Sequence, residues 1–204
     1  MHLVCLDLEG VLIPEIWINF AERTGIEALR LTTRDIPDYD ELMTRRLAIL
    51  NQHGLGLREI DDVVSGMDPL PGAAAFLSDL RDAYQVVILS DTFYEFGMPF
   101  MRKLGQPTLL CHKLDVAPDG AIRHYLLRQP DPKRKSVQAF HSLNYKIIAA
   151  GDSYNDTTML AEADAGILFR APDNVVREFP QFKQASEYAE LRAEIDAASA
   201  GLSG

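Results

Sequence analysis

Polar side chains that could do chemistry stand in this sequence directly after short apolar runs. In parallel α/β sheets the carboxyl ends of the strands meet at one edge, where ligands bind, so such side chains are expected to lie together. Carboxylates and a hydroxyl at that edge could supply a nucleophile, a proton donor, metal ligands and hydrogen-bond donors, which are the parts that phosphoryl transfer requires. The candidates are Asp7, Glu9, Ser90, Asp91, Asp152 and Asp156.

The apolar runs themselves predict the strands that must position these side chains. Residues 2–6, 85–89, 146–150 and 165–169 form short aliphatic stretches bounded by polar residues, with helical segments nearby. Strands that alternate with helices predict an α/β fold, a Rossmann-like doubly wound parallel sheet. Each strand is expected to stop at its polar residues, so the second should end before Ser90.

Residues 15–70 show helical periodicity and no convincing strand, which predicts an inserted helical cap. Its helices are expected at residues 15–25, 38–53 and 57–64. The expected organisation is therefore a core of residues 1–14 and 71–204, with the cap between its two parts.

Two further segments carry local signals. Two β-rich runs flank Pro118-Asp119-Gly120 within residues 111–129, which predicts a hairpin. The tail after Leu191 is rich in Ala, Ser and Gly and is expected to fray.

Composition excludes several classes of protein. The 204 residues carry a formal net charge of −10, with 47% hydrophobic and 25% charged residues, as in an ordinary globular protein. Without a basic run, the chain is not expected to bind nucleic acid or an acidic membrane surface. The first residues resemble neither a signal peptide nor a membrane span, so a cytoplasmic location is expected.

Cysteine and histidine are interpreted as structural. Cys5 and Cys111 are the only cysteines, and they suit buried, reduced thiols better than a disulfide framework. The five histidines show no spacing typical of a zinc site and are expected at the surface or in the core.

Four segments together resemble a known family. In chain order, the segment Asp7-Leu8-Glu9-Gly10-Val11-Leu12, then Ser90, then Lys133, then Gly151-Asp152-Ser153-Tyr154-Asn155-Asp156 resemble the four motifs of the haloacid dehalogenase superfamily. The resemblance covers nearly the whole chain. It implies a Mg²⁺-dependent phosphatase or phosphotransferase.

The resemblance implies catalytic and metal-binding roles. Asp7 would attack phosphorus and form an aspartyl-phosphate, and Glu9 would protonate the leaving group and then activate the second acceptor. Mg²⁺ would be held by Asp7, the main-chain carbonyl of Glu9, and Asp152, with Asp156 in support.

The phosphoryl group would have its own contacts. Ser90 and Asn155 would donate hydrogen bonds to its oxygens, and Gly10 and Asp91 are placed to offer backbone N–H groups. Lys133 would neutralise its charge, with Lys135 as the alternative.

Two features bear on the substrate. The superfamily's phosphatases usually carry Asp where this chain has Glu9, which leaves water or an alcohol open as the second acceptor. A small helical cap after the first motif is typical of phosphoserine phosphatases. In that group Glu15 would correspond to the carboxylate that binds the substrate ammonium, and Arg46, or alternatively Arg45, to the arginine that binds the carboxylate.

The cap, Glu9 and the length most resemble the bifunctional branch of this group, phosphoserine phosphatase and phosphoserine:homoserine phosphotransferase. Phosphoserine is therefore the expected substrate, homoserine a possible acceptor, and a homodimer possible. The rival interpretations are a phosphatase for another small metabolite, such as a sugar or nucleotide monophosphate, a signalling receiver domain, and a catalytically inactive binding module.

Overall fold

The computed structural model describes residues 1–33, 35–36 and 38–203. Over these residues, seven strands form one sheet in the order β4-β3-β2-β1-β5-β6-β7. Every neighbouring pair is parallel except β3 and β4. The predicted α/β fold with a doubly wound parallel sheet is confirmed. The strands are β1 (His2–Leu6), β2 (Gln85–Phe93), β3 (Thr108–Val116), β4 (Ile122–Leu126), β5 (Lys146–Gly151), β6 (Ala165–Phe169) and β7 (Lys183–Ala185).

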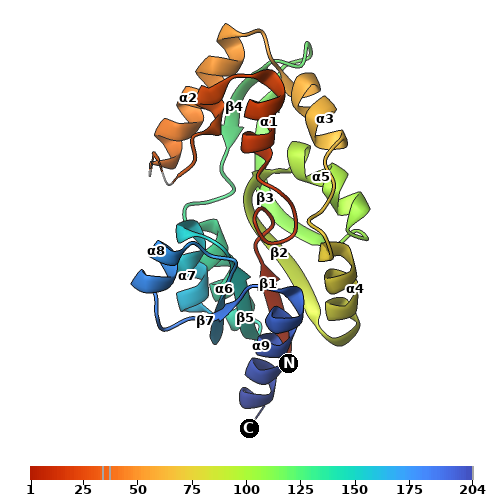
Figure 1. Ribbon diagram of the computed structural model, residues 1–204, viewed down its shortest axis with the longest axis vertical. Helices are drawn as coiled ribbons and strands as arrows, with labels where there is room; N and C mark the ends of the chain where they lie inside the picture. The colour runs from red at the N-terminus through yellow and green to blue at the C-terminus, as the bar shows by residue number, and fades with distance from the viewer. Residues whose placement is uncertain (34, 37, 204) are drawn as a thin grey trace.

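Helices connect and cover the strands. The three helices expected in the cap are present as α1 (Ile16–Thr24), α2 (Tyr39–Gln52) and α3 (Leu57–Ser65), joined by a short 3-10 helix at Glu27–Arg30. They stand together at the end of the molecule opposite both termini (Figure 1). The others are α4 (Ala73–Ala83), α5 (Tyr94–Lys103), α6 (Pro132–Ser142), α7 (Thr157–Glu162), α8 (Asp173–Glu178) and α9 (Tyr188–Gly201).

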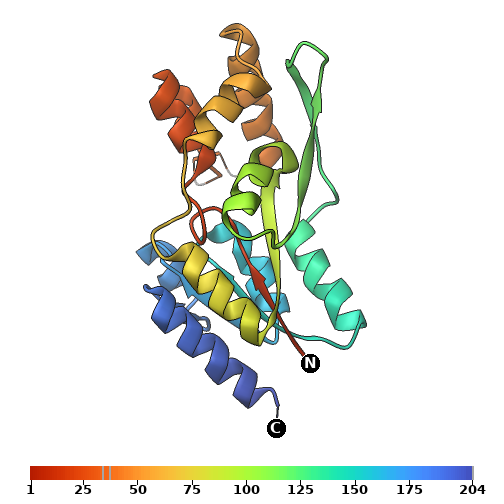
Figure 2. The same cartoon turned by 90° about the vertical axis from the view of Figure 1, so that its right-hand side faces the viewer.

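The central sheet is covered on both faces. Alternate residues of β1 point to opposite sides: Val4 and Leu6 belong to the apolar cluster that includes α4 and α9, whereas Leu3 and Cys5 belong to the cluster under α6 and α7. Figure 2 shows α4 and α9 side by side, with α6 on the other side of the sheet. This two-sided burial explains why the strands are continuous apolar runs.

The topology determines where a ligand can bind. β1 lies between β2 and β5, with Leu6 opposite Ile88 on one side and Ala150 on the other. The chain builds outward from β1 through β2 and β3, then returns to β5 on the opposite side. A crevice forms where strand order reverses in this way, and Asp7 follows β1 directly at that point.

Strand β2 is longer than the sequence suggested. It continues through Ser90 and Asp91 to Phe93, so the expectation that it stops before Ser90 was wrong. Its register with β3 shifts between Leu89 and Phe93, which is typical of a bulge that re-aims side chains next to a functional site.

The predicted hairpin is present as β3 and β4, and it reaches the cap. Strand β4 packs against α2, and the Tyr125 hydroxyl donates a hydrogen bond to Asp40. Farther along, Leu57 N–H donates to the carbonyl of Gly120 at 2.9 Å. A segment from the core half of the sequence therefore supports the cap helices.

The expectation that the tail frays was wrong. Residues 188–201 form α9, in which Leu191 and Ile195 are fully buried. The Glu190 carboxylate accepts hydrogen bonds from the N–H groups of Ser186 and Glu187 and so caps the first turn. Alanine favours helix strongly, and these two apolar side chains, four residues apart, anchor the helix in the core.

Two smaller findings concern the cysteines and membranes. Cys5 and Cys111 are both free and buried, as expected. In the part of the chain that the structure describes, no helix is both long and apolar enough to span a membrane.

Candidate active site

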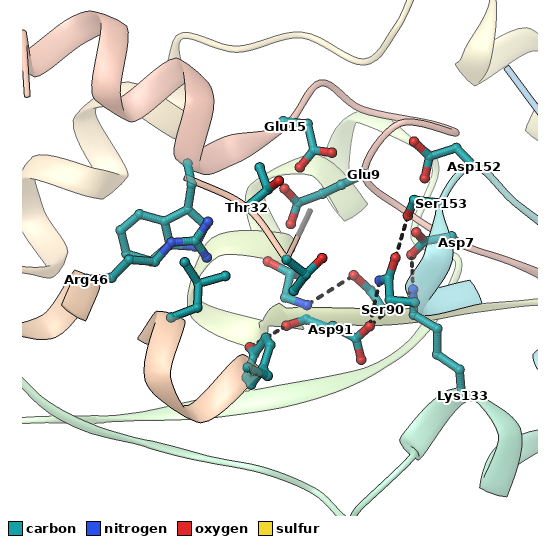
Figure 3. Close-up of a pocket in the computed structure, with 16 residues that line it drawn as sticks. Asp7, Glu9, Glu15, Thr32, Arg46, Ser90, Asp91, Lys133, Asp152 and Ser153 are labelled. Carbon is teal, nitrogen blue, oxygen red and sulfur yellow. Dashed lines mark hydrogen bonds and ion pairs between the residues drawn. The ribbon is translucent and has the colours of Figure 1, made fainter. Parts of the chain in front are cut away.

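Asp7 occupies the crevice at the end of β1 (Figure 3). Its N–H continues the sheet by donating to Ala150 O at 2.9 Å, which fixes the backbone, and its Oδ1 accepts from Leu8 N–H at 2.7 Å. The side chain is buried. Burial, followed by the neighbouring Asp156 carboxylate, raises the pKa of Asp7, and Lys133 acts in the opposite direction.

Lys133 is brought to Asp7 by the first turn of α6, which begins at Pro132. Its Nζ lies 2.9 Å from Asp7 Oδ1, 2.7 Å from Asp156 Oδ1 and 3.4 Å from Asp91 Oδ2. Burial alone would favour the neutral amine, but these carboxylates raise the pKa of Lys133 well above its usual range. The alternative, Lys135, is exposed and donates to Gln138.

Asp152 and Asp156 complete an acidic cluster after β5. One carboxylate oxygen from each of Asp7, Asp152 and Asp156 lies within 4.8 Å of the other two. Asp156 is engaged at both oxygens, since Oδ1 binds Lys133 and Oδ2 accepts the N–H groups of Asp152 and Ser153 at 3.0 and 3.1 Å. It is therefore placed to orient the loop, while Asp7 and Asp152 present oxygens to the pocket.

The donor set fits a divalent cation. Asp7, Asp91 and Asp156 surround the ammonium group of Lys133, and Asp152 lies beside Asp7 and Asp156, so negative charge is in excess at this cluster. A hard cation that prefers carboxylate and carbonyl oxygens would neutralise this excess. The structure thus supports a metal site at this cluster.

Gly10 is required by the shape of the loop after β1. Its φ is +76°, and a Cβ placed on it would lie 2.4 Å from Asp152 Oδ2. Its N–H donates to Ile13 O at 2.8 Å. In this arrangement the N–H closes the loop, so its predicted contact with a phosphoryl oxygen requires it to exchange partners, and Gly10 makes room for Asp152.

Glu9 lies between the acidic cluster and the cap. Its Oε2 accepts from Ile16 N–H at 2.9 Å, at the start of α1. Burial, followed by the charge of Glu15, raises the pKa of Glu9 to about 8. A carboxyl group with this pKa carries a proton at neutral pH, as a general acid must.

The cap supplies the opposite end of the pocket. Figure 3 shows Arg46 at one end, Lys133 and Asp152 at the other, and Glu9 and Glu15 between them. Arg46 is buried and donates from Nη2 to Leu31 O at 2.7 Å, whereas Arg45 is exposed and pairs with Glu41 on the surface of α2. The structure therefore places Arg46 in the pocket and Arg45 outside it.

Ser90 and Asn155 line the pocket near Asp7. Ser90 is buried, and its Oγ accepts from Thr92 N–H at 3.2 Å. The Asn155 amide donates from Nδ2 to Asp91 Oδ2 at 2.8 Å. In this arrangement Asn155 binds a neighbouring carboxylate, so its predicted contact with a phosphoryl oxygen requires the amide to exchange partners.

Sequence reasoning listed Asp91 among the candidate side chains but assigned a role only to its backbone N–H, and it missed the partner of the carboxylate, His112. His112 Nε2 lies 3.7 Å from Asp91 Oδ1, and its Nδ1 accepts from Arg128 N–H at 3.1 Å. Burial opposes ionisation, but Lys133, then His112 and Asn155, hold the pKa of Asp91 below its usual range. The position of Asp91 next to Ser90 was the available signal, whereas His112 lies on β3 and nothing in its sequence context indicated this contact.

Tyr39 was also missed, and it joins the cap to the core. At the start of α2, its hydroxyl donates to Asp91 O at 3.0 Å. The side chain lines the same pocket as Arg46 and Lys133. The first turn of α2 is therefore anchored on β2, the strand that carries Ser90.

This fold and this set of side chains define a class of protein. The family model of the haloacid dehalogenase-like hydrolases matches residues 1–164, and the chain belongs to this family.

More specific likenesses come from individual proteins. The chain is 62% identical over 204 residues to the phosphoserine phosphatase ThrH of Pseudomonas aeruginosa, covering 100% of both chains. It is 64% identical over 199 residues to a phosphoserine phosphatase of Pseudomonas syringae pv. tomato, covering 98% of this chain and 84% of that one. A solved phospho-aspartyl intermediate analogue of phosphoserine phosphatase superposes with a TM-score of 0.76 at 17% identity, covering 95% of this chain and 98% of that one. The last likeness shows a shared fold.

Proposed function

We propose that this chain is a Mg²⁺-dependent phosphoserine phosphatase that forms a covalent aspartyl-phosphate on Asp7. The observation that carries the substrate assignment is the buried guanidinium of Arg46 at the end of the pocket opposite Lys133. The family assignment and the two relatives named as phosphoserine phosphatases support it.

Arg46 has unused binding capacity. Its Nη2 binds Leu31 O, but its buried Nε has no hydrogen-bond partner among the described residues. Burial lowers the pKa of Arg46 to about 10, so the cation is held at a cost in free energy. A substrate carboxylate would provide the missing charge and hydrogen bond, and the guanidinium fork suits two carboxylate oxygens.

The other charges of phosphoserine have counterparts along the pocket. The phosphoryl group would lie by Lys133 and Ser90, and the ammonium group by Glu15, which is half-buried between the two ends. An acidic protein can bind this anion because the cations that contact it are local.

The residues present can carry both chemical steps. In the first, an oxygen of Asp7 forms a bond to phosphorus, the bond from phosphorus to the serine oxygen breaks, and the Glu9 carboxyl gives its proton to that oxygen. In the second, Glu9 takes a proton from water as the water oxygen bonds to phosphorus, which releases Asp7 and phosphate. Lys133 offsets the charge on the phosphoryl oxygens. Mg²⁺ held by Asp7, the Glu9 carbonyl and Asp152 would supply electrostatic stabilisation of that charge.

Three finer points remain proposals. Homoserine, which is serine with one more methylene, could replace water in the second step, because a pocket discriminates weakly against one methylene. A homodimer and a cytoplasmic location are likewise predictions from the resemblance and from the composition.

The test is phosphate release from a panel of phosphate esters, with Mg²⁺ or EDTA and with or without homoserine, followed by analysis of all phosphorylated products. We expect phosphoserine to be preferred and EDTA to abolish turnover. Arg46→Ala should lose roughly 10²-fold or more in kcat/KM for phosphoserine but spare an aryl phosphate, since a buried carboxylate would lose its partner. Arg45→Ala is the matched control and should behave as the wild type.

Turnover of a sugar or nucleotide phosphate in preference to phosphoserine would refute the substrate assignment. O-phosphohomoserine among the products would establish the transferase. Phosphoserine with homoserine that gives only serine and phosphate would exclude it.

A further inference from the structure

The guanidinium of Arg46 lies on an aromatic platform. Arg46 Cζ is 4.5 Å from the ring centroid of Trp17, in the first turn of α1 and two residues after Glu15. Trp17 is 8% exposed and lines the pocket together with Arg46. A cation stacked on an indole in a desolvated site is held more strongly than at an exposed surface.

Other rings fix the plane of this indole. Trp17 meets Phe96 edge to face, with centroids 5.8 Å apart and planes at 75°, and meets Phe20 at 6.2 Å and 87°. Phe96 belongs to α5 of the core and Phe20 to α1 of the cap, and both are buried. The indole therefore cannot tilt without disturbing the packing between cap and core.

Stacking holds Arg46 without consuming its N–H groups. Nη2 donates to Leu31 O and Nη1 makes a long contact of 3.8 Å with the Met43 sulfur, while the N–H of Nε has no hydrogen-bond partner among the described residues. A guanidinium that is held by stacking on one face and by one strong hydrogen bond still has N–H donors for a ligand. The alternative, a salt bridge to a protein carboxylate, would compete with the substrate.

We infer that Trp17 is a positioning residue that sets the preference of this enzyme for phosphate esters bearing a carboxylate. It acts through Arg46 by holding the guanidinium in place at its end of the pocket. This inference rests on the proposed function. It predicts an effect on substrate binding rather than on the chemistry at Asp7.

The first experiment compares phosphoserine with phosphoethanolamine, which lacks the carboxylate. Trp17→Leu should raise KM for phosphoserine roughly tenfold and leave kcat within about twofold, with little change in KM for phosphoethanolamine. Trp17→Phe, which keeps an aromatic face, should recover most of the loss. Phe76→Leu is the matched control: it removes a buried ring of α4, which belongs to the same apolar cluster but stacks on Tyr188, and it should leave the KM ratio unchanged.

The second experiment begins with the wild-type protein, whose response does not depend on how a variant folds. Trp17 is the only tryptophan of the chain, so its fluorescence reports on this contact. Serine should change the emission on binding, whereas ethanolamine should not, and Arg46→Ala should abolish the response to serine.

The outcomes distinguish a failure of the role inferred for Trp17 from a failure of the proposed function. If Trp17→Leu raises KM equally for both esters, or if Phe76→Leu matches it, the inference is overturned and Trp17 serves only packing. If serine leaves the wild-type emission unchanged, the inference is overturned as well. If the wild type ignores phosphoserine while another ester turns over, the proposed function itself fails.

Discussion

Replacing Gly10 by alanine should weaken the metal site by displacing Asp152. Gly10 adopts φ +76°, and a Cβ there would lie 2.4 Å from Asp152 Oδ2 and 2.5 Å from its Cγ. Contacts this short cannot persist, so the carboxylate must move. The positive φ adds a backbone cost of roughly 1–2 kcal/mol for any residue with a Cβ.

Gly25→Ala is the matched control. Gly25 ends α1 with φ +70°, but apart from its chain neighbours no atom of the described residues lies within 4 Å of the added Cβ. Both variants therefore carry the backbone cost, and each kcal/mol of it should lower the Tm by about 2–4 °C in a chain of this length. Only Gly10→Ala moves a predicted metal ligand.

The assay is a Mg²⁺ titration of phosphoserine turnover, with Tm measured in parallel. We expect the half-maximal Mg²⁺ concentration to rise roughly 10–100-fold in Gly10→Ala, the range seen when groups that orient a metal ligand are changed. In Gly25→Ala it should not change. A Gly10→Ala enzyme with the wild-type Mg²⁺ dependence would refute the assignment of Asp152 to the metal.

Three further predictions follow from the same geometry. Glu9 has a pKa of about 8 and must be protonated to act as an acid, so turnover should fall as pH rises through about 8. Glu9→Gln should lower turnover roughly 10²–10⁴-fold with phosphoserine but much less with an aryl phosphate, whose leaving group needs no proton. Equal losses with the two substrates would contradict this role. Lys133→Met should abolish turnover and lower the free energy of unfolding by roughly 3–5 kcal/mol, because buried carboxylates lose their partner. Lys135→Met, measured in the same denaturation and activity assays, should change neither. Burial opposes ionisation of Asp164, but hydrogen bonds from Ile147 N–H, Lys146 and His141 lower its pKa. The ionised carboxylate therefore stabilises the fold above the unfolded pKa of about 3.9, and this stabilisation is lost as pH falls through the folded pKa. Asp164→Asn should lower the free energy of unfolding by about 1–2 kcal/mol in urea denaturation at pH 7, and an equal loss at pH 3 would refute this role of Asp164.

Local patterns predicted the frame of the molecule well. Runs of aliphatic residues mark β1, β5 and β6 because strands covered on both faces must be apolar throughout. Helical periodicity identified α1, α2 and α3 within one or two residues. These signals depend on residues that are close together in the chain, so they can be read from a single sequence.

The errors occurred where long-range contacts override local preference. β2 runs on past Leu89 because β3 pairs with it again at His112, beyond the bulge. The tail is ordered because Leu191 and Ile195 dock on the core. Neither partner is close in the sequence, so composition alone could not reveal the contact.

The sequence by itself determined the residue types of the site and their order, because phosphoryl transfer constrains which groups follow which strand. Only the tertiary structure decided between residues of one type that are neighbours in the chain. Arg46 faces the pocket and Arg45 the solvent, and Lys133 reaches Asp7 while Lys135 does not. Adjacent positions on a helix point about 100° apart, and which direction leads inward depends on how the whole helix packs.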